Sequence, residues 1–312
     1  MRTEREAGVP GGVERQHLPE LPYADWLPTK TTLHLYCQVV GKVRLARMPP
    51  LNHWWHVTLY PSPRGLTTGS VPDGGGAFEI AFDLVDHRLR VETSRGDRRS
   101  FALAGQPVAE FHRQLFAALG ELGIEARIDP RPFDMGVDVP FAEDREHHAW
   151  DRDAIGRFWR ILLWSTEVLE RFAGRFNGKA TPVHLFWHSF DLAYTRFSGR
   201  RAPEMQEADP VTREAYTHEV ISFGFWAGDE SLPEPAWYAY AWPSPDGLTD
   251  RPLEPAAAEW SLRTGSPQAL LRWAELRRSE TAEDDLLAFL ESAYRAAGEA
   301  AGWPLAELER RG

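Results

Sequence analysis

The chain has 312 residues, of which 43% are hydrophobic and 12% aromatic, and its formal net charge is −11. This composition supplies a large core and excludes an intrinsically disordered chain, and the negative charge argues against nucleic-acid binding through phosphate contacts. No apolar run approaches the ~20 residues of a membrane span, the N-terminus lacks a signal peptide's apolar centre, and the single cysteine, Cys37, excludes an intrachain disulfide. We therefore expect a cytoplasmic protein, a monomer or a homodimer, without a nucleic-acid or membrane partner.

The N-terminal part of the chain predicts a flexible segment followed by a helix, several strands and a second helix. Residues 1–20 are polar and rich in Gly and Glu, so we expect them to be flexible. Apolar residues at helical spacing that stop at a Pro-Pro pair predict a helix over roughly 30–47. From "NHWWHVTLY" onward the apolar spacing changes to two, which predicts strands up to a helix over roughly 107–122. The following "IEARIDPRPF" predicts a closing edge strand.

A junction rich in Pro, Gly and acidic residues, at 129–150, separates this part from a second one. The helix predicted after it, "DRDAIGRFWRILLWSTEVLERFAGRF", has so broad an apolar face that we expect burial on more than one side. Short aromatic segments between turns then predict antiparallel strands, and Thr281 and Asp284 predict a capping box for the last helix. Both parts contain the turn sequence P-S-P-x-G-L-T. We predict an α+β protein of two similar halves, 21–140 and 141–312, each mainly antiparallel sheet with packing helices, around one shared core or two.

The stretch from His184 to Arg200, "HLFWHSFDLAYTRFSGR", concentrates ionisable and aromatic residues. As a helix it would place His184, His188 and Asp191 on one face, where they could hold a metal ion. As a strand it would separate the two histidines by roughly 13 Å and point Asp191 to the opposite side. We favour the strand, because aromatic residues and threonine favour strands and no N-cap precedes His184. No local metal site then forms, and any site must be assembled from neighbouring strands.

Neighbouring strands supply the groups that such a site needs. Acid–base chemistry requires a base and a group that orients it, and the candidate catalytic residues are His184, His218, Glu219 and Asp191. Arginines suit anionic groups, and alternating aromatic residues form a wall; the candidate ligand-binding residues are Arg196, Arg200, His53, His56, Tyr238, Tyr240, Trp242 and Lys179. Each of these side chains could instead be a half-buried sheet residue satisfied by backbone hydrogen bonds.

Several longer stretches together resemble a known family. "LNHWWHVTLY", "FEIAFDLVDHRL", "GKATPVHLFWHSFDLAYTRFSGRRAP", "TREAYTHEVISFGFW" and "EPAWYAYAWP" are similar to the uncharacterised bacterial DUF5996 family over roughly residues 20–305. The resemblance implies no activity, since the family has none established. Members often have glycine where this chain has His188, which further weakens a metal site that depends on His188.

The leading hypothesis is a protein that binds a small molecule, anionic in one version, either without catalysis or as an enzyme of hydrolase or transferase type. In the enzyme, His184 or His218 acts as general base, a carboxylate orients it, and Arg196 holds an anionic substrate group. The first alternative is a non-catalytic interaction or self-associating protein with surface tryptophans, Trp54, Trp226 or Trp237. The second alternative is a metal-binding protein. No cofactor is named, because the phosphate-loop and zinc-protease motifs are absent.

Overall fold

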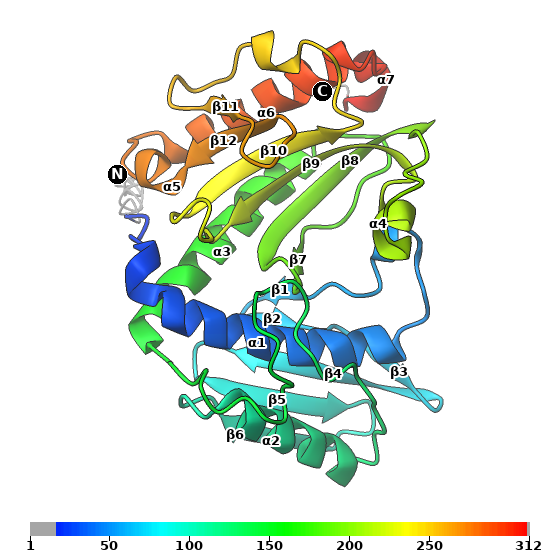
Figure 1. Ribbon diagram of the computed structural model, residues 1–312, viewed down its shortest axis with the longest axis vertical. Coiled ribbons are helices and arrows are strands. Elements are labelled where there is room, and N and C mark those ends of the chain that lie inside the picture. The colour runs from blue at the N-terminus through cyan, green and yellow to red at the C-terminus, as the bar shows by residue number, and fades with distance from the viewer. Residues whose placement is uncertain (1–16, 311–312) are drawn as a thin grey trace, which may run out of the picture.

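The computed structural model describes residues 17–310 and confirms the α+β class. Two antiparallel sheets of six strands each lie one above the other in Figure 1. Most of the segment expected to be flexible, residues 1–16, lies outside the described residues. None of the helices within residues 17–310 is long and apolar enough to cross a membrane.

The N-terminal sheet has the order β1-β2-β4-β5-β6, with β3 paired to β4. Its strands are β1 Tyr60–Ser62, β2 Gly65–Thr67, β3 Val71–Asp73, β4 Gly76–Asp83, β5 Arg88–Thr93 and β6 Arg98–Ala102. The C-terminal sheet has the order β11-β12-β10-β9-β8-β7. Its strands are β7 His184–Phe186, β8 Asp191–Arg201, β9 His218–Trp226, β10 Ala236–Trp242, β11 Glu259–Ser261 and β12 Gln268–Arg272. A bridge between Leu59 and Leu185 connects the two sheets.

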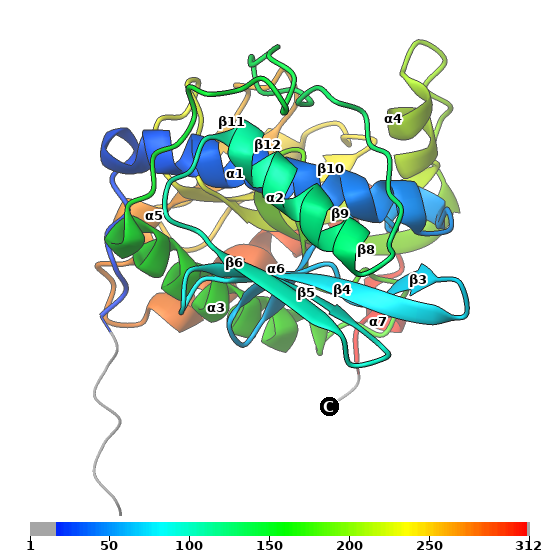
Figure 2. The ribbon, with the colours of Figure 1, turned by 90° about the horizontal axis from the view of Figure 1, so that it is seen from below.

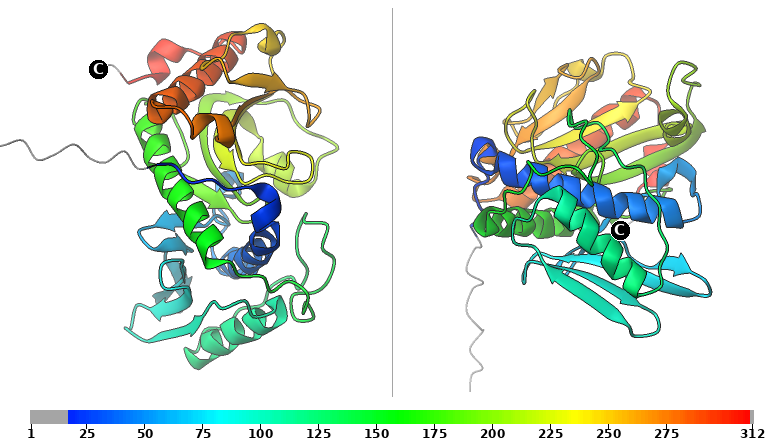
Figure 3. Two further views of the ribbon diagram at one scale, coloured as in Figure 1. Left: turned by 90° about the vertical axis from the view of Figure 1, so that its left-hand side faces the viewer. Right: turned by 60° about the horizontal axis from the view of Figure 1, so that its bottom comes forward.

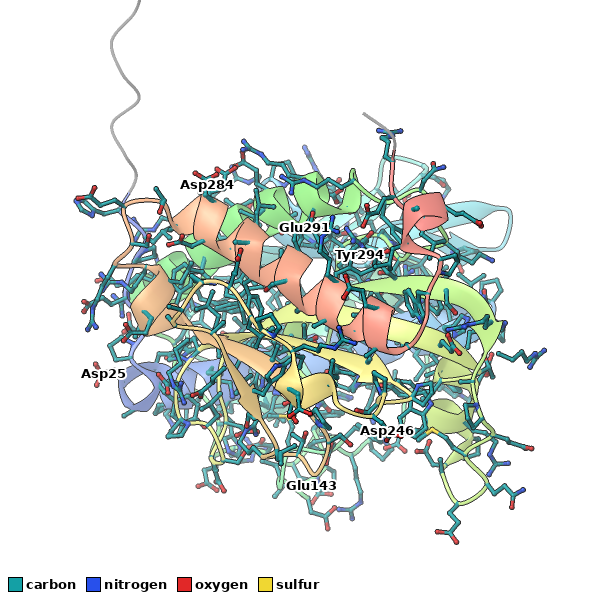
Figure 4. The ribbon with its side chains drawn as sticks, turned by 90° about the horizontal axis from the view of Figure 1, so that it is seen from above. Asp25, Glu143, Asp246, Asp284, Glu291 and Tyr294 are labelled. Carbon is teal, nitrogen blue, oxygen red and sulfur yellow. The ribbon has the colours of Figure 1, made fainter. Side chains whose placement is uncertain are left out.

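Four long helices pack around the sheets: α1 Tyr23–Arg47, α2 Val108–Glu121, α3 Arg152–Ala173 and α6 Ala282–Ala300. Helix α1 crosses between the sheets, and Figure 2 shows α2 lying across the N-terminal sheet. Helix α3 passes along both sheets in Figure 3, and α6 covers the C-terminal sheet in Figure 4. The short helices are α4 Pro210–Ala215, α5 Trp273–Leu276 and α7 Leu305–Leu308, with 3-10 turns at Asn52–Trp54 and Leu248–Asp250.

Helix α1 is buried along most of its length and carries polar groups into the interior. Gln38 pairs with the backbone of Phe133 through both its amide atoms, at 2.7 and 2.8 Å, much as a neighbouring strand would. Lys42 donates to the carbonyl of Arg131 at 2.6 Å. These bonds satisfy a loop that has no sheet partner, so α1 holds the segment between the two halves in place. One contiguous hydrophobic core includes side chains from both sheets and from all four long helices.

The structure corrects several details of the sequence-based prediction. Helix α1 begins at Tyr23 rather than near residue 30, and Pro28 lies inside it. No strand forms over 124–133, because the helix side chains described above replace the strand partner. The segment at Asn52–Trp54 is a 3-10 turn rather than a strand. Thr281 is the N-cap of α6, but its side chain makes no capping bond.

The repeated turn sequence adopts two different structures. In the first copy, Ser62 pairs with Gly65 in a tight hairpin between β1 and β2. In the second, Pro243 follows a cis peptide bond, and Gly247 has the left-handed φ of 68° that starts a 3-10 turn. The similarity of these two stretches therefore reflects turn chemistry rather than a shared conformation.

Candidate functional site

The two faces of the C-terminal sheet differ in kind. One face packs on α3 and α6 and carries apolar residues such as Leu192, Phe223 and Trp237. The strand registers place a second set on the opposite face, which we call the polar face: His184, Asp191, Thr195, Ser222, Tyr238, Tyr240 and Trp242. The expected alternation of Tyr238, Tyr240 and Trp242 onto one face is thus present. Hydroxyl groups and one carboxylate gather on this face.

A tight turn brings His184 and Asp191 to the same face. The sequence predicted one continuous strand with the two residues on opposite sides, and this detail was wrong. β7 ends at Phe186, residues 187–190 form a turn, and β8 begins at Asp191. His184 pairs with Ala193, and Phe186 pairs with Asp191, so the histidine and the carboxylate are diagonal neighbours. Phe190 takes the left-handed φ of 58° in this turn, a strained conformation that the surrounding packing must maintain.

Asp191 lies at one end of the polar face, where β8 begins. Its side chain is 8% exposed, and its two oxygens accept hydrogen bonds from the hydroxyls of Ser189 and Tyr238. Tyr238 reaches Asp191 by crossing Gly224 on the intervening strand, where a Cβ would lie 2.5 Å from the tyrosine oxygen. Burial and the charge of Asp191 raise the pKa of Tyr238 well above its usual value, so its hydroxyl stays protonated and donates.

A second row of hydroxyl groups runs beside the first. Thr195 and Ser222 share a hydrogen bond of 2.5 Å between facing positions of β8 and β9. Tyr240, which pairs with Ser222, shares a 2.8 Å bond with Tyr216, from the segment between α4 and β9. Burial raises the pKa of both tyrosines, so both hydroxyls remain protonated. The row is a connected set of groups, each able to donate and to accept.

His184 presents an unused acceptor beside Asp191. Its Nδ1 lies 2.8 Å from the carbonyl oxygen of Pro182, which can only accept, so Nδ1 carries the proton. Its Nε2 is buried and has no hydrogen-bond partner among residues 17–310. Desolvation lowers the pKa of His184 to about 4, and the ring is therefore neutral at pH 7. A buried acceptor without a partner is uncommon in folded proteins.

His34 of α1 holds the turn that creates this arrangement. Its Nε2 lies 2.9 Å from the carbonyl oxygen of Trp187 and 3.1 Å from that of His188, and its ring stacks on Phe190. Burial lowers the pKa of His34 to about 3. Trp187 itself packs against α1 at Gly41, where a Cβ would lie 2.2 Å from the indole ring. The position of Asp191 thus depends on a helix about 150 residues earlier in the chain.

Arg196, expected to hold an anionic ligand, lies on the core face instead. Its guanidinium is 1% exposed and donates to the carbonyl of Phe172 at 2.7 Å, close to the C-terminus of α3. The ring of Phe172 lies 3.6 Å from the guanidinium carbon, and that of Tyr294, labelled in Figure 4, reaches it from α6 at 4.4 Å. Arg196 therefore contacts the core rather than the polar face.

His218 is far from Asp191. It opens β9, whereas Asp191 faces Trp226 at the other end of that strand, roughly 26 Å away at 3.3 Å per residue. The ring of His53 packs on His218 with centroids 5.4 Å apart. The Nδ1 of His53 is hydrogen-bonded to the carbonyl of Ala215 at 2.9 Å. Desolvation, followed by nearby positive charge, lowers the pKa of His218. One small ligand cannot contact both ends of the strand.

The remaining candidates have local partners. Glu219 accepts from Ser198 at 2.8 Å and pairs with Arg200 at 2.7 Å, and Arg200 also donates to the carbonyl of Ala301 at the end of α6. His56 accepts from the backbone of Leu51 at 3.2 Å. Lys179 is exposed on the loop before β7, near His218. Glu219 and Trp242 also line a small cavity of about 120 Å³.

The described residues offer less support for the two alternatives, a self-associating protein and a metal-binding protein. Trp237 is fully buried, so it is not part of a surface, while Trp54 and Trp226 are half-buried. Within residues 17–310, no three His, Cys, Asp or Glu side chains are placed to share a metal ion.

Sequence reasoning missed Ser189, Thr195, Ser222, Tyr216, Gly224 and His34. Ser189, Thr195 and Ser222 are small residues in apolar strands or turns. Which groups their hydroxyls contact depends on the strand register, which the sequence does not show. His34 and Tyr216 come from outside the sheet, and the sequence carries no local signal of their contact with it. Gly224 was detectable as an isolated glycine in a strand, which often marks a close approach.

Comparison with known proteins places the chain in a family. A family model described as a family of unknown function, DUF5996, matches residues 18–310, and the chain belongs to this family. Searches of curated proteins and of solved structures found no match.

Proposed function

We propose that the polar face of the C-terminal sheet binds a small molecule bearing a hydrogen-bond donor, with a protonated amine as the clearest case. The observation that carries the proposal is the position of Asp191. Its carboxylate is nearly buried, is held by two hydroxyls, and has no Arg or Lys partner among the described residues. A buried carboxylate is stabilised by a positive partner, and a cationic ligand would supply one.

The aromatic side chains around Asp191 suit the same ligand. The rings of Tyr238 and Tyr240 stack with centroids 6.0 Å apart, and Tyr238 bonds to Asp191. Aromatic faces attract ammonium groups, most strongly where water is excluded. Between Asp191 and Trp242, the central strands β8, β9 and β10 place no Arg or Lys on this face. An anionic ligand would therefore meet a carboxylate without a compensating charge.

A second candidate function is acid–base catalysis of the hydrolase or transferase type on the same face. The free Nε2 of His184 favours it, because that nitrogen can accept a proton from a bound hydroxyl or amine. Asp191 on the same face would stabilise the imidazolium that forms. The low pKa of His184 makes it a weak base until a ligand adds negative charge nearby.

Titration of the purified protein with agmatine, ethanolamine and choline tests the binding proposal. Binding would be measured by calorimetry and by the shift in the melting temperature. We expect at least one amine to bind, and Asp191→Asn or Tyr238→Phe to weaken it about tenfold or more, as for a lost charge-assisted contact. The matched control is Asp246→Asn, which removes one exposed carboxylate from a loop of the same half (Figure 4) and should leave binding unchanged. Equal amine affinities in the wild type and in Asp191→Asn would refute the site.

A further inference from the structure

A second hollow of the molecule has a different chemical character. It is an open groove of about 460 Å³ between the first half of α3 and the turn that joins β4 to β5. Its lining includes three arginines of α3, Arg152, Arg157 and Arg160, together with His87 from the turn and Trp159. Figure 3 shows α3 continuing from this region to the C-terminal sheet, so the groove and the polar face lie on different parts of the molecule.

The three arginines lack partners and line the same groove. Most arginines described in this acidic chain form ion pairs, but none of these three has a carboxylate within 4 Å or a side-chain hydrogen bond in residues 17–310. Arg157 and Arg160 are one turn apart on α3, where two like charges repel. Asp153 is the one acidic residue in the lining, so the groove keeps an excess of positive charge. An anion would relieve that repulsion.

His87 is a lining residue of the groove whose ring has one nitrogen already engaged. The indole Nε1 of Trp150 lies 3.3 Å from Nδ1 of His87 and can only donate. The neutral ring must therefore carry its proton on Nε2, and it presents this N–H as a donor. The backbone of His87 has the left-handed φ of 50°. Its backbone carbonyl accepts a hydrogen bond from the amide of Leu103, which fixes the residue at the groove wall.

We propose that this groove binds a small molecule that carries phosphate groups. A carboxylate is satisfied by one guanidinium fork, whereas a phosphate offers enough oxygens for several forks to converge. Arg152 and Arg160 are eight residues apart, about 12 Å along the helix axis, which matches a ligand with more than one phosphate rather than a single ion. The volume is that of a small-ligand pocket, and the net negative charge of the chain opposes an extended polyanion such as RNA.

Pyrophosphate is the probe for the test, with binding measured by calorimetry at low and at raised salt. We expect the wild type to bind it, more weakly as salt increases, and R157Q/R160Q to weaken binding about tenfold or more. The control R98Q/R127Q removes the same charge from two exposed arginines without side-chain partners among the described residues, and should change the affinity less than about twofold.

Two further measurements keep the result decisive. Far-UV circular dichroism and the melting temperature establish that the double variant is folded, and the single variant R160E, at an exposed position, should abolish binding by charge reversal. Absence of pyrophosphate binding by the wild type, or an equal loss in R157Q/R160Q and R98Q/R127Q, would overturn the proposal. The amine titrations address a different face, so either proposal can fail without the other.

Discussion

The N-terminal and C-terminal sheets each pack one face against the common core, but the side chains on their opposite faces differ in kind. On the N-terminal sheet that face carries charged residues, some of which form ion pairs, as in the 3.4 Å pair of Arg90 with Asp83 and the 2.7 Å pair of Arg64 with Asp83. On the C-terminal sheet, the polar face is mostly hydroxyl and aromatic, with one carboxylate at the end where β8 begins.

The difference lies in how the polar groups of the two faces are satisfied. Asp83 is buried, but its arginine partners reach solvent and keep the outer face hydrated. Nearly buried hydroxyls that bond to one another around an unpaired carboxylate are costly to hold together unless they are fully satisfied or serve a ligand. Two groups of this face have no hydrogen-bond partner among residues 17–310, the Nε2 of His184 and the indole Nε1 of Trp242.

The largest predicted effect is a loss of stability in acid that begins in the C-terminal sheet. Lowering the pH from about 7 to about 5 should decrease the free energy of unfolding by about 4 kcal/mol, about half from each of two buried histidines. Burial lowers the pKa of His184 to about 4 and of His34 to about 3, whereas both titrate near 6.5 in the unfolded chain. The unfolded state then binds protons that the folded state excludes, so this stability is present above pH 6.5 and is lost as the pH falls toward 4.

Urea unfolding at several pH values measures this loss, and hydrogen exchange locates it. Exchange should increase first in β7 and β8, because His184 lies in β7 and His34 bonds to the turn between these two strands. His34→Gln keeps a donor for the carbonyl of Trp187 and should remove about half of the pH dependence. Equal stability of the wild type at both pH values would show that the two rings are not buried in solution.

Replacing an arginine should destabilise the protein more in the C-terminal sheet than in the N-terminal sheet. Arg196→Ala should destabilise the protein by about 3 kcal/mol, because it leaves a cavity among aromatic rings and removes the guanidinium hydrogen bond to the carbonyl of Phe172. Arg90→Ala, on the outer face of the N-terminal sheet, should cost less than about 1 kcal/mol. Arg196→Met, which refills the space, should recover part of the loss. Urea unfolding of the three variants checks the order, and similar losses for both alanines would contradict the core position of Arg196.

The long helices could be predicted from the sequence because their information is local. Apolar stripes at helical spacing located α2, α3 and α6 with small errors at their ends. The stretch 124–133 has alternating apolar residues as a strand would, yet its backbone partner is the side chain of Gln38, 95 residues away. Such a partner is invisible to any local pattern.

The candidate site was predictable in composition but not in arrangement. The aromatic face of β10 followed from alternation alone, whereas the side on which Asp191 lies depended on the turn at 187–190. That turn reverses the chain and is held by His34 from α1, so its position is set by tertiary contact. A small shift in the turn changes which residues share a face, and this explains why His184 and Asp191 were predicted on opposite sides.

The smallest effect concerns a glycine in each sheet. Gly224→Ala should destabilise the protein by about 2 kcal/mol, because the new methyl would lie 2.2 Å from the backbone oxygen of Leu192 and 2.5 Å from the hydroxyl of Tyr238. Gly76→Ala in β4 would meet the side-chain hydroxyl of Ser94 at 2.8 Å and no backbone atom closer than 3.5 Å, and should cost less than about 1 kcal/mol. If the methyl acts by displacing Tyr238, the double variant with Tyr238→Phe should lose less than the sum of the single losses. Strict additivity in that cycle would mean that the Tyr238–Asp191 contact does not depend on the space above Gly224.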